Sequence, residues 1–188
     1  MNLIIFGPPG AGKGTQAELI VKTFNLYQLS TGKILRNEIR NKTLLGQKIS
    51  SIINAGSLVS DDVVKKLVEN FVSDDKYKNR LIFDGYPRNL TQAKTLKELL
   101  AKYGQTINLV IKLTVSLDSI KKRIIERKNI ENRIDDNEET AIKRYNTYEK
   151  STEPIIEYYK KLNLLKEIDG ERSIDQINKE ISDIINLI

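Results

Sequence analysis

A glycine-rich segment near the start of the chain has the residue types and spacing of a phosphate-binding loop. Residues 7–15 read GPPGAGKGT and fit the pattern G-x-x-x-x-G-K. Glycines let backbone N–H groups turn towards phosphate oxygens, a following helix presents its positive end to the same anion, and Lys13 can reach the outer phosphates. An apolar run at residues 3–6 precedes the segment, and a helical pattern follows it. This context favours a nucleotide phosphate site over a Gly/Pro-rich turn that binds nothing.

Two positions bear on a magnesium ion beside those phosphates. Gly14 stands where Ser or Thr normally follows the lysine, and Thr15 comes one position later, so the usual hydroxyl contact with Mg²⁺ is open to question. Asp84 ends a second apolar run, residues 80–83. Because sites in parallel sheets lie at the carboxyl ends of strands, Asp84 is the best candidate to hold Mg²⁺ through water. The alternative is an Asp that caps a turn.

The composition excludes several other chemistries. The 188 residues include no His and no Cys, which excludes thiol catalysis, disulfides, serine–histidine chemistry and zinc held by Cys or His. The net charge of +6 comes from 31 basic and 25 acidic residues. Because acids are interspersed, a solvated lysine-rich surface is favoured over a nucleic-acid patch. No apolar run reaches membrane-spanning length and no signal peptide is evident, so we expect a cytoplasmic location.

Arginine is scarce in this chain and lysine is common. Arg occurs nine times, and Lys supplies the other 22 basic residues. Because a planar guanidinium can form two parallel hydrogen bonds with phosphate, we expect arginine where that geometry matters. Arg123 and Arg127 are four residues apart and share one helix face. Arg133 and Arg144 are eleven apart and project the same way if that helix is continuous.

Alternating strands and helices must position these residues. Short apolar runs predict four buried strands, at residues 3–6, 80–83, 109–115 and 164–168. Helical patterns cover residues 15–24, 32–40, 44–54, 63–72, 90–103, 116–128, 136–161 and 173–187. We expect a polar break at residues 129–132, and Pro154 to bend or restart its helix. The alternation predicts one α/β domain with a parallel sheet covered by helices on both faces.

Four motifs, in order and at matching spacings, resemble adenylate kinase. They are GPPGAGKGTQA at residues 7–17, LSTGKILR at 29–36, GSLVSDDVV at 56–64 and FDGYPRNLTQA at 83–93. The resemblance continues through residues 123–140 and 168–173, and therefore covers nearly the whole chain. It implies a three-layer P-loop kinase of the nucleoside monophosphate kinase family. The implied reaction is reversible and Mg²⁺-dependent, ATP + AMP ⇌ 2 ADP, and serves adenine nucleotide homeostasis.

The resemblance also implies how the chain is divided. The core would comprise residues 1–29, 60–127 and 137–188, with a helical AMP-binding insert at 30–59 and a very short lid at 128–136. Both the insert and the lid would be mobile. Long-lid relatives carry a small β subdomain, sometimes with zinc, and this chain is too short there to build one. We therefore expect Mg²⁺ as the cofactor and no zinc. The expected ligands are ATP, AMP and ADP. We also expect a monomer that binds neither nucleic acid nor membrane.

Site residues follow from the same resemblance. The ATP-binding set is Gly10, Ala11, Gly12, Lys13, Gly14, Thr15, Arg123, Arg127 and Arg172. The AMP-binding set is Thr31, Arg36, Ser57, Leu58, Val59, Gly85, Tyr86, Pro87, Arg88, Gln92, Arg133 and Arg144. The catalytic set is Lys13, Arg88, Arg123, Arg127, Arg133 and Arg144. Arg172 is expected to contribute through its backbone more than its charge, whereas Arg40 and Arg80 are interpreted as ordinary surface charges.

The choice of acceptor depends on two residues. By resemblance, Thr31 and Gln92 are adenine-side signatures, whereas uridylate and cytidylate kinases tend to have Ala and Asn there. An amide can pair with the N6 donor of adenine and the adjacent ring nitrogen, so AMP is favoured over a pyrimidine nucleotide. Lys33 departs from the family pattern, which usually has an acid there, and could alter a contact between insert and lid. Tyr86 stands where the family more commonly has Phe, and we expect this difference to have a mild effect.

Two functions from other classes compete with a kinase. A non-catalytic nucleotide-binding regulator would have lost the arginines of the lid, and all of them are present. A nucleic-acid-binding module would need aromatic platforms or a clustered basic face, and only 6% of the residues are aromatic.

Overall fold

The computed structural model describes residues 1–131 and 137–188, without the side chains of residues 129–131. Five strands of this part of the chain form one parallel sheet in the order β2-β3-β1-β4-β5. The strands are β1 (Leu3–Phe6), β2 (Tyr27–Ser30), β3 (Leu81–Asp84), β4 (Leu109–Thr114) and β5 (Leu165–Asp169). The helices are α1 (Lys13–Phe24), α2 (Thr31–Arg40), α3 (Leu44–Asn54), α4 (Asp61–Val72), α5 (Leu90–Lys102), α6 (Leu117–Glu131), α7 (Glu138–Lys161) and α8 (Ile174–Ile185).

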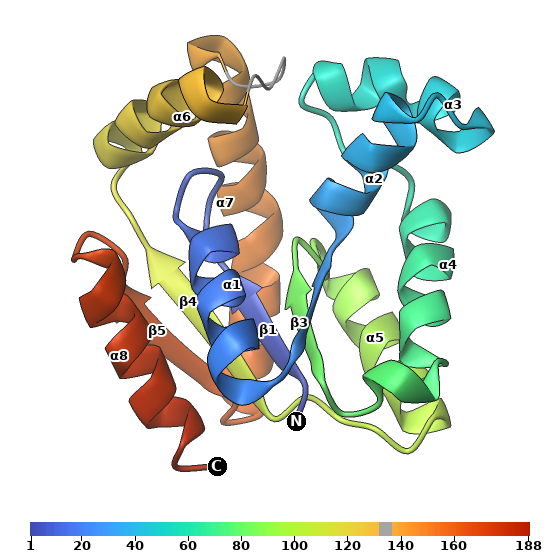
Figure 1. Ribbon diagram of the computed structural model, residues 1–188, viewed down its shortest axis with the longest axis vertical. Coiled ribbons are helices and arrows are strands. Elements are labelled where there is room, and N and C mark those ends of the chain that lie inside the picture. The colour runs from blue at the N-terminus through green and yellow to red at the C-terminus, as the bar shows by residue number, and fades with distance from the viewer. Residues whose placement is uncertain (132–136) are drawn as a thin grey trace.

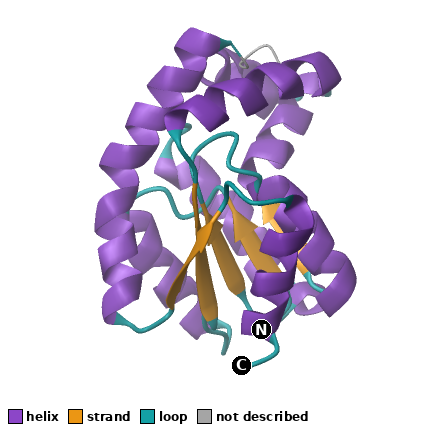
Figure 2. Cartoon of the chain, turned by 90° about the vertical axis from the view of Figure 1, so that its left-hand side faces the viewer, coloured by secondary structure: helices purple, strands orange, loops and turns teal. Residues whose placement is uncertain are grey.

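Helices cover both faces of the sheet, as Figure 2 shows. Side chains alternate along a strand, so Leu3 and Ile5 of β1 face a core shared with α1 and α8. Ile4 and Phe6 face the opposite core, which α4, α5 and α7 complete. The predicted three-layer α/β architecture is therefore confirmed. Within the described ranges, no helix has both the length and the apolar character needed to cross a membrane.

The sequence analysis missed the edge strand β2. Tyr27 is exposed and Gln28 half-buried, and only the last two residues of the strand are buried. A strand that is polar along half its length lacks the continuous apolar run by which the other four were found. Its parallel pairing with β3 places Ser30 opposite Asp84, so both strands end at the same edge of the sheet.

The expected polar break in the second half of the chain was wrong, and so was the expectation that Pro154 could restart its helix, whereas a bend at Pro154 stays a prediction. The polar break expected at residues 129–132 is absent from its described part, because α6 continues to Glu131. An asparagine, such as the one at position 129, costs a helix less than about 1 kcal/mol relative to alanine. That cost alone does not end a helix. Pro154 lies inside α7, which runs unbroken from Glu138 to Lys161. Buried neighbours such as Ile155 and Tyr159 pack into the core and offset the lost backbone hydrogen bond.

Helices α2 and α3 form a hairpin that projects beyond the sheet (Figure 1). Thr43 begins α3 as its N-cap and accepts a hydrogen bond from the backbone N–H of Gly46 at 3.0 Å. Its hydroxyl donates to the Glu38 carboxylate at 2.6 Å. A Cβ atom added at Gly46 would lie 2.1 Å from the backbone oxygen of Glu38, so the two helices can approach this closely only because residue 46 has no side chain.

We expect Gly46→Ala to destabilise the protein by roughly 1–3 kcal/mol, because the new methyl group forces the backbones of α2 and α3 apart. Thermal unfolding followed by circular dichroism measures the loss. Ser51→Ala on the exposed face of α3 is the matched control and should leave the melting temperature nearly unchanged. Equal melting temperatures for Gly46→Ala and the unaltered protein would contradict the close approach.

Candidate nucleotide site

A cavity of about 710 Å³ lies at the carboxyl edge of the sheet, within the range of small-molecule sites. Figure 1 shows α2 and α3 on one side above this edge, and α6 with the upper part of α7 on the other. The cavity is lined by nearly every expected site residue that the structure describes: Gly10, Ala11, Gly12, Lys13, Gly14, Thr15, Thr31, Arg36, Ser57, Leu58, Val59, Asp84, Gly85, Pro87, Arg88, Gln92, Arg123, Arg127, Arg144 and Arg172.

One expected residue that the structure describes, Tyr86, is not in this lining. Tyr86 is buried behind it, and its hydroxyl donates to the backbone oxygen of Gln92 at 3.4 Å. Burial and the negative charge of Asp61 raise the pKa of Tyr86 to about 12, so the phenol supports the wall as a neutral group. Arg133 lies outside the described residues.

The phosphate loop joins β1 to α1 and leaves the start of α1 open. Gly12 is the N-cap, with φ 91°, a left-handed conformation that suits glycine, and no side chain of the described residues caps this helix end. The first N–H groups of α1 therefore lack helical partners and can bind an anion. Lys13 Nζ donates to the backbone oxygens of Gly7 at 2.6 Å and Pro8 at 2.9 Å, which folds its side chain back over the loop.

Positive charge is concentrated around the Lys13 ammonium group. Burial lowers the pKa of Lys13 to about 8, and the charges of Arg144, Arg88 and Arg127 act in the same direction. Only Asp84, among the described groups that act on this amine, raises its pKa. A polyanion in the cavity would remove this mutual repulsion and favour the protonated amine.

The turn after β3 presents Arg88. Gly85 has φ 77°, and its backbone oxygen accepts hydrogen bonds from Arg88 Nε at 2.8 Å and Thr31 Oγ1 at 2.9 Å. A Cβ at Gly85 would lie 3.0 Å from the Thr31 hydroxyl, so both backbone conformation and space require glycine here. Burial and the nearby charge of Arg144 lower the pKa of Arg88.

Asp84 is buried at the end of β3, where it accepts a hydrogen bond from Gln28 Nε2 at 3.0 Å. Among the described residues, no three His, Cys, Asp or Glu side chains form a cluster that could hold a metal by themselves. Mg²⁺ commonly binds through one or two carboxylates, water and substrate phosphates, so a lone carboxylate beside a phosphate loop fits this ion. Thr15 is exposed on the same cavity and offers a hydroxyl.

Lys33, which departs from the family pattern, pairs with groups of the core. Its ammonium forms an ion pair with Glu18 of α1 and lies 3.4 Å from Gln28 Oε1. Since Gln28 also bonds Asp84, Lys33 is linked to the candidate metal ligand through one amide. The expected effect on a contact between insert and lid stays a prediction, because residues 132–136 are not described.

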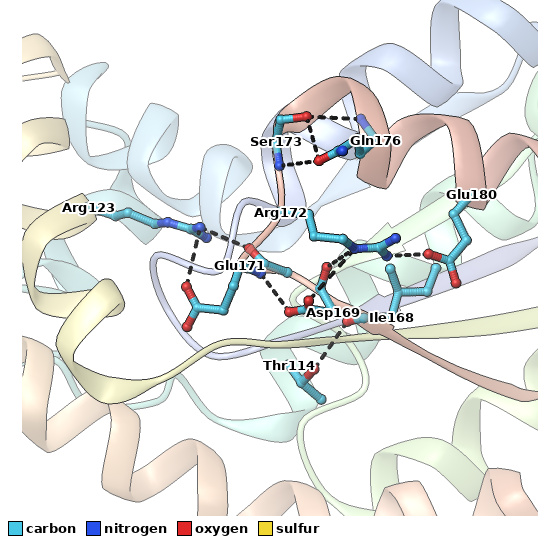
Figure 3. A network of polar contacts seen from close by, with 10 residues as sticks. Thr114, Arg123, Ile168, Asp169, Glu171, Arg172, Ser173, Gln176 and Glu180 are labelled. Carbon is cyan, nitrogen blue, oxygen red and sulfur yellow. Dashed lines mark hydrogen bonds and ion pairs between the residues drawn. The ribbon is translucent and has the colours of Figure 1, made fainter.

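The loop between β5 and α8 holds two arginines differently (Figure 3). Arg123 Nη2 donates to the backbone oxygen of Gly170 at 2.9 Å and lies 3.9 Å from the Glu171 carboxylate. Hydrogen bonds from the Ser116 backbone and from the Ser119 and Ser116 hydroxyls, together with the Arg123 charge, lower the pKa of Glu171 to about 2. Glu171 therefore stays ionised at the start of α6, where its carboxylate also faces the Arg123 guanidinium from the second turn of that helix.

The Arg172 side chain points away from Arg123, towards α8 (Figure 3). Its guanidinium pairs with Glu180 and lies 3.8 Å from the Asp169 carboxylate. These two carboxylates balance its charge, which supports the expectation that Arg172 contributes mainly through its backbone.

Three polar residues of the cavity region were missed by sequence reasoning. Gln16 Nε2 donates to the backbone oxygen of Ile174 at 3.0 Å, and its buried Oε1 has no hydrogen-bond partner among the described residues. Gln28 and Glu171 position Asp84 and Arg123 as described above. Gln16 and Gln28 are single amides at ordinary helix and strand positions, and no sequence pattern identifies them.

The two arginines interpreted as surface charges differ from each other. Arg40 is exposed and donates to Asn37 Oδ1 at 3.0 Å. Arg80 uses its planar fork on the protein itself: Nε and Nη2 donate to the backbone oxygen of Asn25 at 3.0 and 2.8 Å. Asn25 is the left-handed C-cap of α1, so Arg80 fastens the end of that helix. Arg80 is exposed, in line with its interpretation as a surface charge, but it also has a structural contact that the sequence analysis did not predict.

A glycine loop between a buried parallel strand and a helix, facing several arginines across one cavity, defines the class of P-loop nucleotide kinases. The family model for adenylate kinase matches residues 5–164. An adenylate kinase of Pelagibacter ubique is 44% identical and covers 100% of both chains. An adenylate kinase of Prochlorococcus marinus (strain MIT 9301) is also 44% identical and covers 96% of each. The chain belongs to the adenylate kinase family.

The pKa of Lys13 predicts how nucleotide binding depends on pH. The amine is protonated below about pH 8 and loses its proton above it. Because bound phosphates favour the charged amine, ATP binding at pH 9 should take up most of a proton, and affinity should fall by up to about tenfold per pH unit above 8. Calorimetric titrations in buffers of different ionisation enthalpy measure this uptake. At pH 9 the phosphates of ATP are already ionised and do not contribute.

Lys13→Arg is the matched control for this experiment, because a guanidinium stays charged throughout this pH range. Its affinity for ATP should not fall between pH 7.5 and 9. Identical pH profiles for Lys13→Arg and the unaltered protein would show that another group titrates.

Proposed function

We propose that this protein is a phosphotransferase that reversibly moves the terminal phosphoryl group of ATP to AMP, giving two ADP. One observation carries the proposal: Lys13 of the phosphate loop lies close to three arginines that line the same cavity, Arg88, Arg127 and Arg144. Two phosphate-bearing ligands placed end to end repel each other, and such a cluster of cations offsets that repulsion. Family membership supports adenine nucleotides as the pair.

In the proposed complex, the phosphate loop, Lys13, Arg123 and Arg127 hold the triphosphate of ATP, while Arg36 and Arg88 hold the phosphate of AMP. An oxygen of the AMP phosphate attacks the terminal phosphorus of ATP, and the bond to the bridging oxygen breaks as ADP leaves. The attacking oxygen is already ionised near neutral pH, so no general base is required. This agrees with a chain that has no His and no Cys.

Charge develops on the transferring group and on the leaving oxygen. Lys13, Arg88 and Arg144 would stabilise it as fixed donors, with Arg133 added from the proposed lid. Asp84, with Thr15, would hold Mg²⁺ mainly through water, and the ion would supply charge neutralisation between the outer phosphates.

We propose that residues 30–59 form the AMP-binding insert and residues 128–136 a short lid. In support, the loop after α3 reaches across the cavity to α7, where Lys143 Nζ donates to the backbone oxygen of Ala55 at 2.8 Å. A Cβ at Gly56 would lie 2.8 Å from a Thr140 methyl group and 3.3 Å from Arg144. The proposed insert therefore contacts α7 beside Arg144, a member of the cation cluster. Movement of the insert would open the cavity to water or close it.

The proposal is tested by measuring ADP formation from ATP and Mg²⁺ with a panel of nucleoside monophosphates. We expect kcat/KM to favour AMP over UMP and CMP by at least about 10²-fold, because each mispaired buried polar group costs roughly 1–3 kcal/mol. Comparable use of UMP or CMP would contradict the choice of AMP but not phosphoryl transfer. No turnover with any acceptor would contradict the kinase proposal.

Arginine-to-lysine variants test whether guanidinium geometry matters for transfer. Arg88→Lys and Arg144→Lys keep the charge but lose paired hydrogen bonds to phosphate. We expect kcat to fall by about 10²–10³-fold in each, the loss typical of one well-placed donor in a dry site. Arg88→Lys also loses the hydrogen bond from Nε to the backbone oxygen of Gly85 and should lower stability by about 1 kcal/mol, so kinetics are compared at a temperature where thermal unfolding shows each variant to be folded.

Arg40→Lys and Arg80→Lys are the controls and should alter kcat less than about twofold, because exposed charges contribute little. Arg80→Lys should lower stability by about 1 kcal/mol through its lost contacts with Asn25. If lysine works as well as arginine at position 144, or if Arg80→Lys slows turnover as much as Arg88→Lys, the geometric argument fails.

A further inference from the structure

The side-chain amide of Gln92 is held at both ends by the protein. Gln92 is 5% exposed and lies in the first turn of α5, on the cavity wall. Its Oε1 accepts a hydrogen bond from the backbone N–H of Arg88 at 2.7 Å. Its Nε2 donates to Asp61 Oδ1 at 2.6 Å. The protein therefore sets which end of the amide carries the oxygen and which carries the NH₂ group.

Asp61 is itself fixed by a second contact. Its Oδ2 accepts a hydrogen bond from Asn89 Nδ2 at 3.0 Å, and Asn89 Oδ1 accepts one from the backbone N–H of Gln92 at 2.7 Å. Asp61 lies in the first turn of α4 and Asn89 is the N-cap of α5. The carboxylate thus lies at the positive ends of two helices, which favour a negative charge.

This arrangement resists rotation of the amide. A half-turn about its last bond would place Oε1 of Gln92 against the Asp61 carboxylate and its NH₂ group against the N–H of Arg88. Both hydrogen bonds would be lost, and like partners would face each other at each end. An amide oxygen has a second lone pair and an NH₂ group a second hydrogen, so one acceptor and one donor remain for a ligand.

We propose that Asp61 is a positioning residue that sets base specificity by fixing the orientation of the Gln92 amide, an inference that rests on the proposed function. The fixed acceptor and donor match a 6-amino purine, whose exocyclic NH₂ donates and whose ring nitrogen accepts. A 6-oxo purine has the same size but the reverse pattern, because its exocyclic oxygen accepts and its ring N–H donates. A free amide could turn to suit either base, whereas this one cannot.

The test compares AMP with IMP as acceptors in the unaltered protein and in Asp61→Asn. The unaltered protein should prefer AMP by at least about 10²-fold in kcat/KM. Asparagine cannot accept from both Gln92 and Asn89, so the amide gains freedom to turn. We expect the preference for AMP over IMP to shrink at least tenfold, mainly through a higher KM for AMP and a lower one for IMP. The KM for ATP should stay constant.

Asp62→Asn is the matched control, because it removes a neighbouring exposed carboxylate from the same first turn of α4. It should leave the ratio of AMP to IMP use unchanged. Asp61→Ser is a second variant, which removes the carboxylate contacts with Gln92 and Asn89. It replaces Asp61→Asn in the comparison if that variant does not fold. Melting temperatures of all three variants show which are folded.

The outcomes separate the two proposals. If the unaltered protein phosphorylates AMP but neither Asp61 variant changes the AMP to IMP ratio, the orienting role of Asp61 is overturned. An equal change in Asp62→Asn would overturn it too, since the cause would then be the charge at the helix end. If the unaltered protein does not phosphorylate AMP, the proposed function fails instead.

Discussion

Positive charge gathered in one cavity is the constraint on which the rest of this structure depends. Lys13, Arg88, Arg127 and Arg144 lie close enough for the three arginines to lower the pKa of the lysine. Such a cluster destabilises a fold that holds no anion, so it needs a rigid frame. Buried parallel strands supply that frame: Lys13 begins the helix after β1, and Arg88 follows β3, its neighbour in the sheet.

Local patterns in the sequence were sufficient to predict the phosphate loop and most of the sheet. The loop is encoded in nine consecutive residues, and four strands are short apolar runs between polar turns. Strand β2 could not be found in this way, because its pairing with β3 is made by backbone groups and half its side chains are not buried. The positions of Gln16, Gln28 and Glu171 depend on contacts between residues far apart in the chain, which single-sequence patterns do not carry.

In this chain the few arginines indicate where a planar pair of donors is needed, and such places are not confined to the nucleotide site. Arg88 and Arg144 line the cavity and Arg80 lies outside it, all three as expected, but Arg80 has a contact that was not expected. Its fork binds the backbone oxygen of Asn25, which ends α1 in a left-handed turn. A helix C-terminus carries carbonyl oxygens without helical partners, and a guanidinium satisfies them as it satisfies a phosphate. In a lysine-rich chain, arginine therefore marks sites that need two aligned donors, whether the acceptor is a ligand or the backbone.

The placement of carboxylates follows from the same constraint. A negative charge near the transferring phosphates would oppose binding. Asp84, which raises the pKa of Lys13, is the acid proposed to hold a divalent cation, and that ion would neutralise the repulsion. Glu171 and Asp61 instead contact two residues proposed to bind nucleotide, Arg123 at the triphosphate of ATP and Gln92 at the base of AMP. Both acids lie at helix N-termini, at the starts of α6 and α4, where the helix end favours their charge. The fold thereby places these two anions beside residues proposed to recognise nucleotide, while the cation cluster lines the cavity where phosphate is proposed to bind.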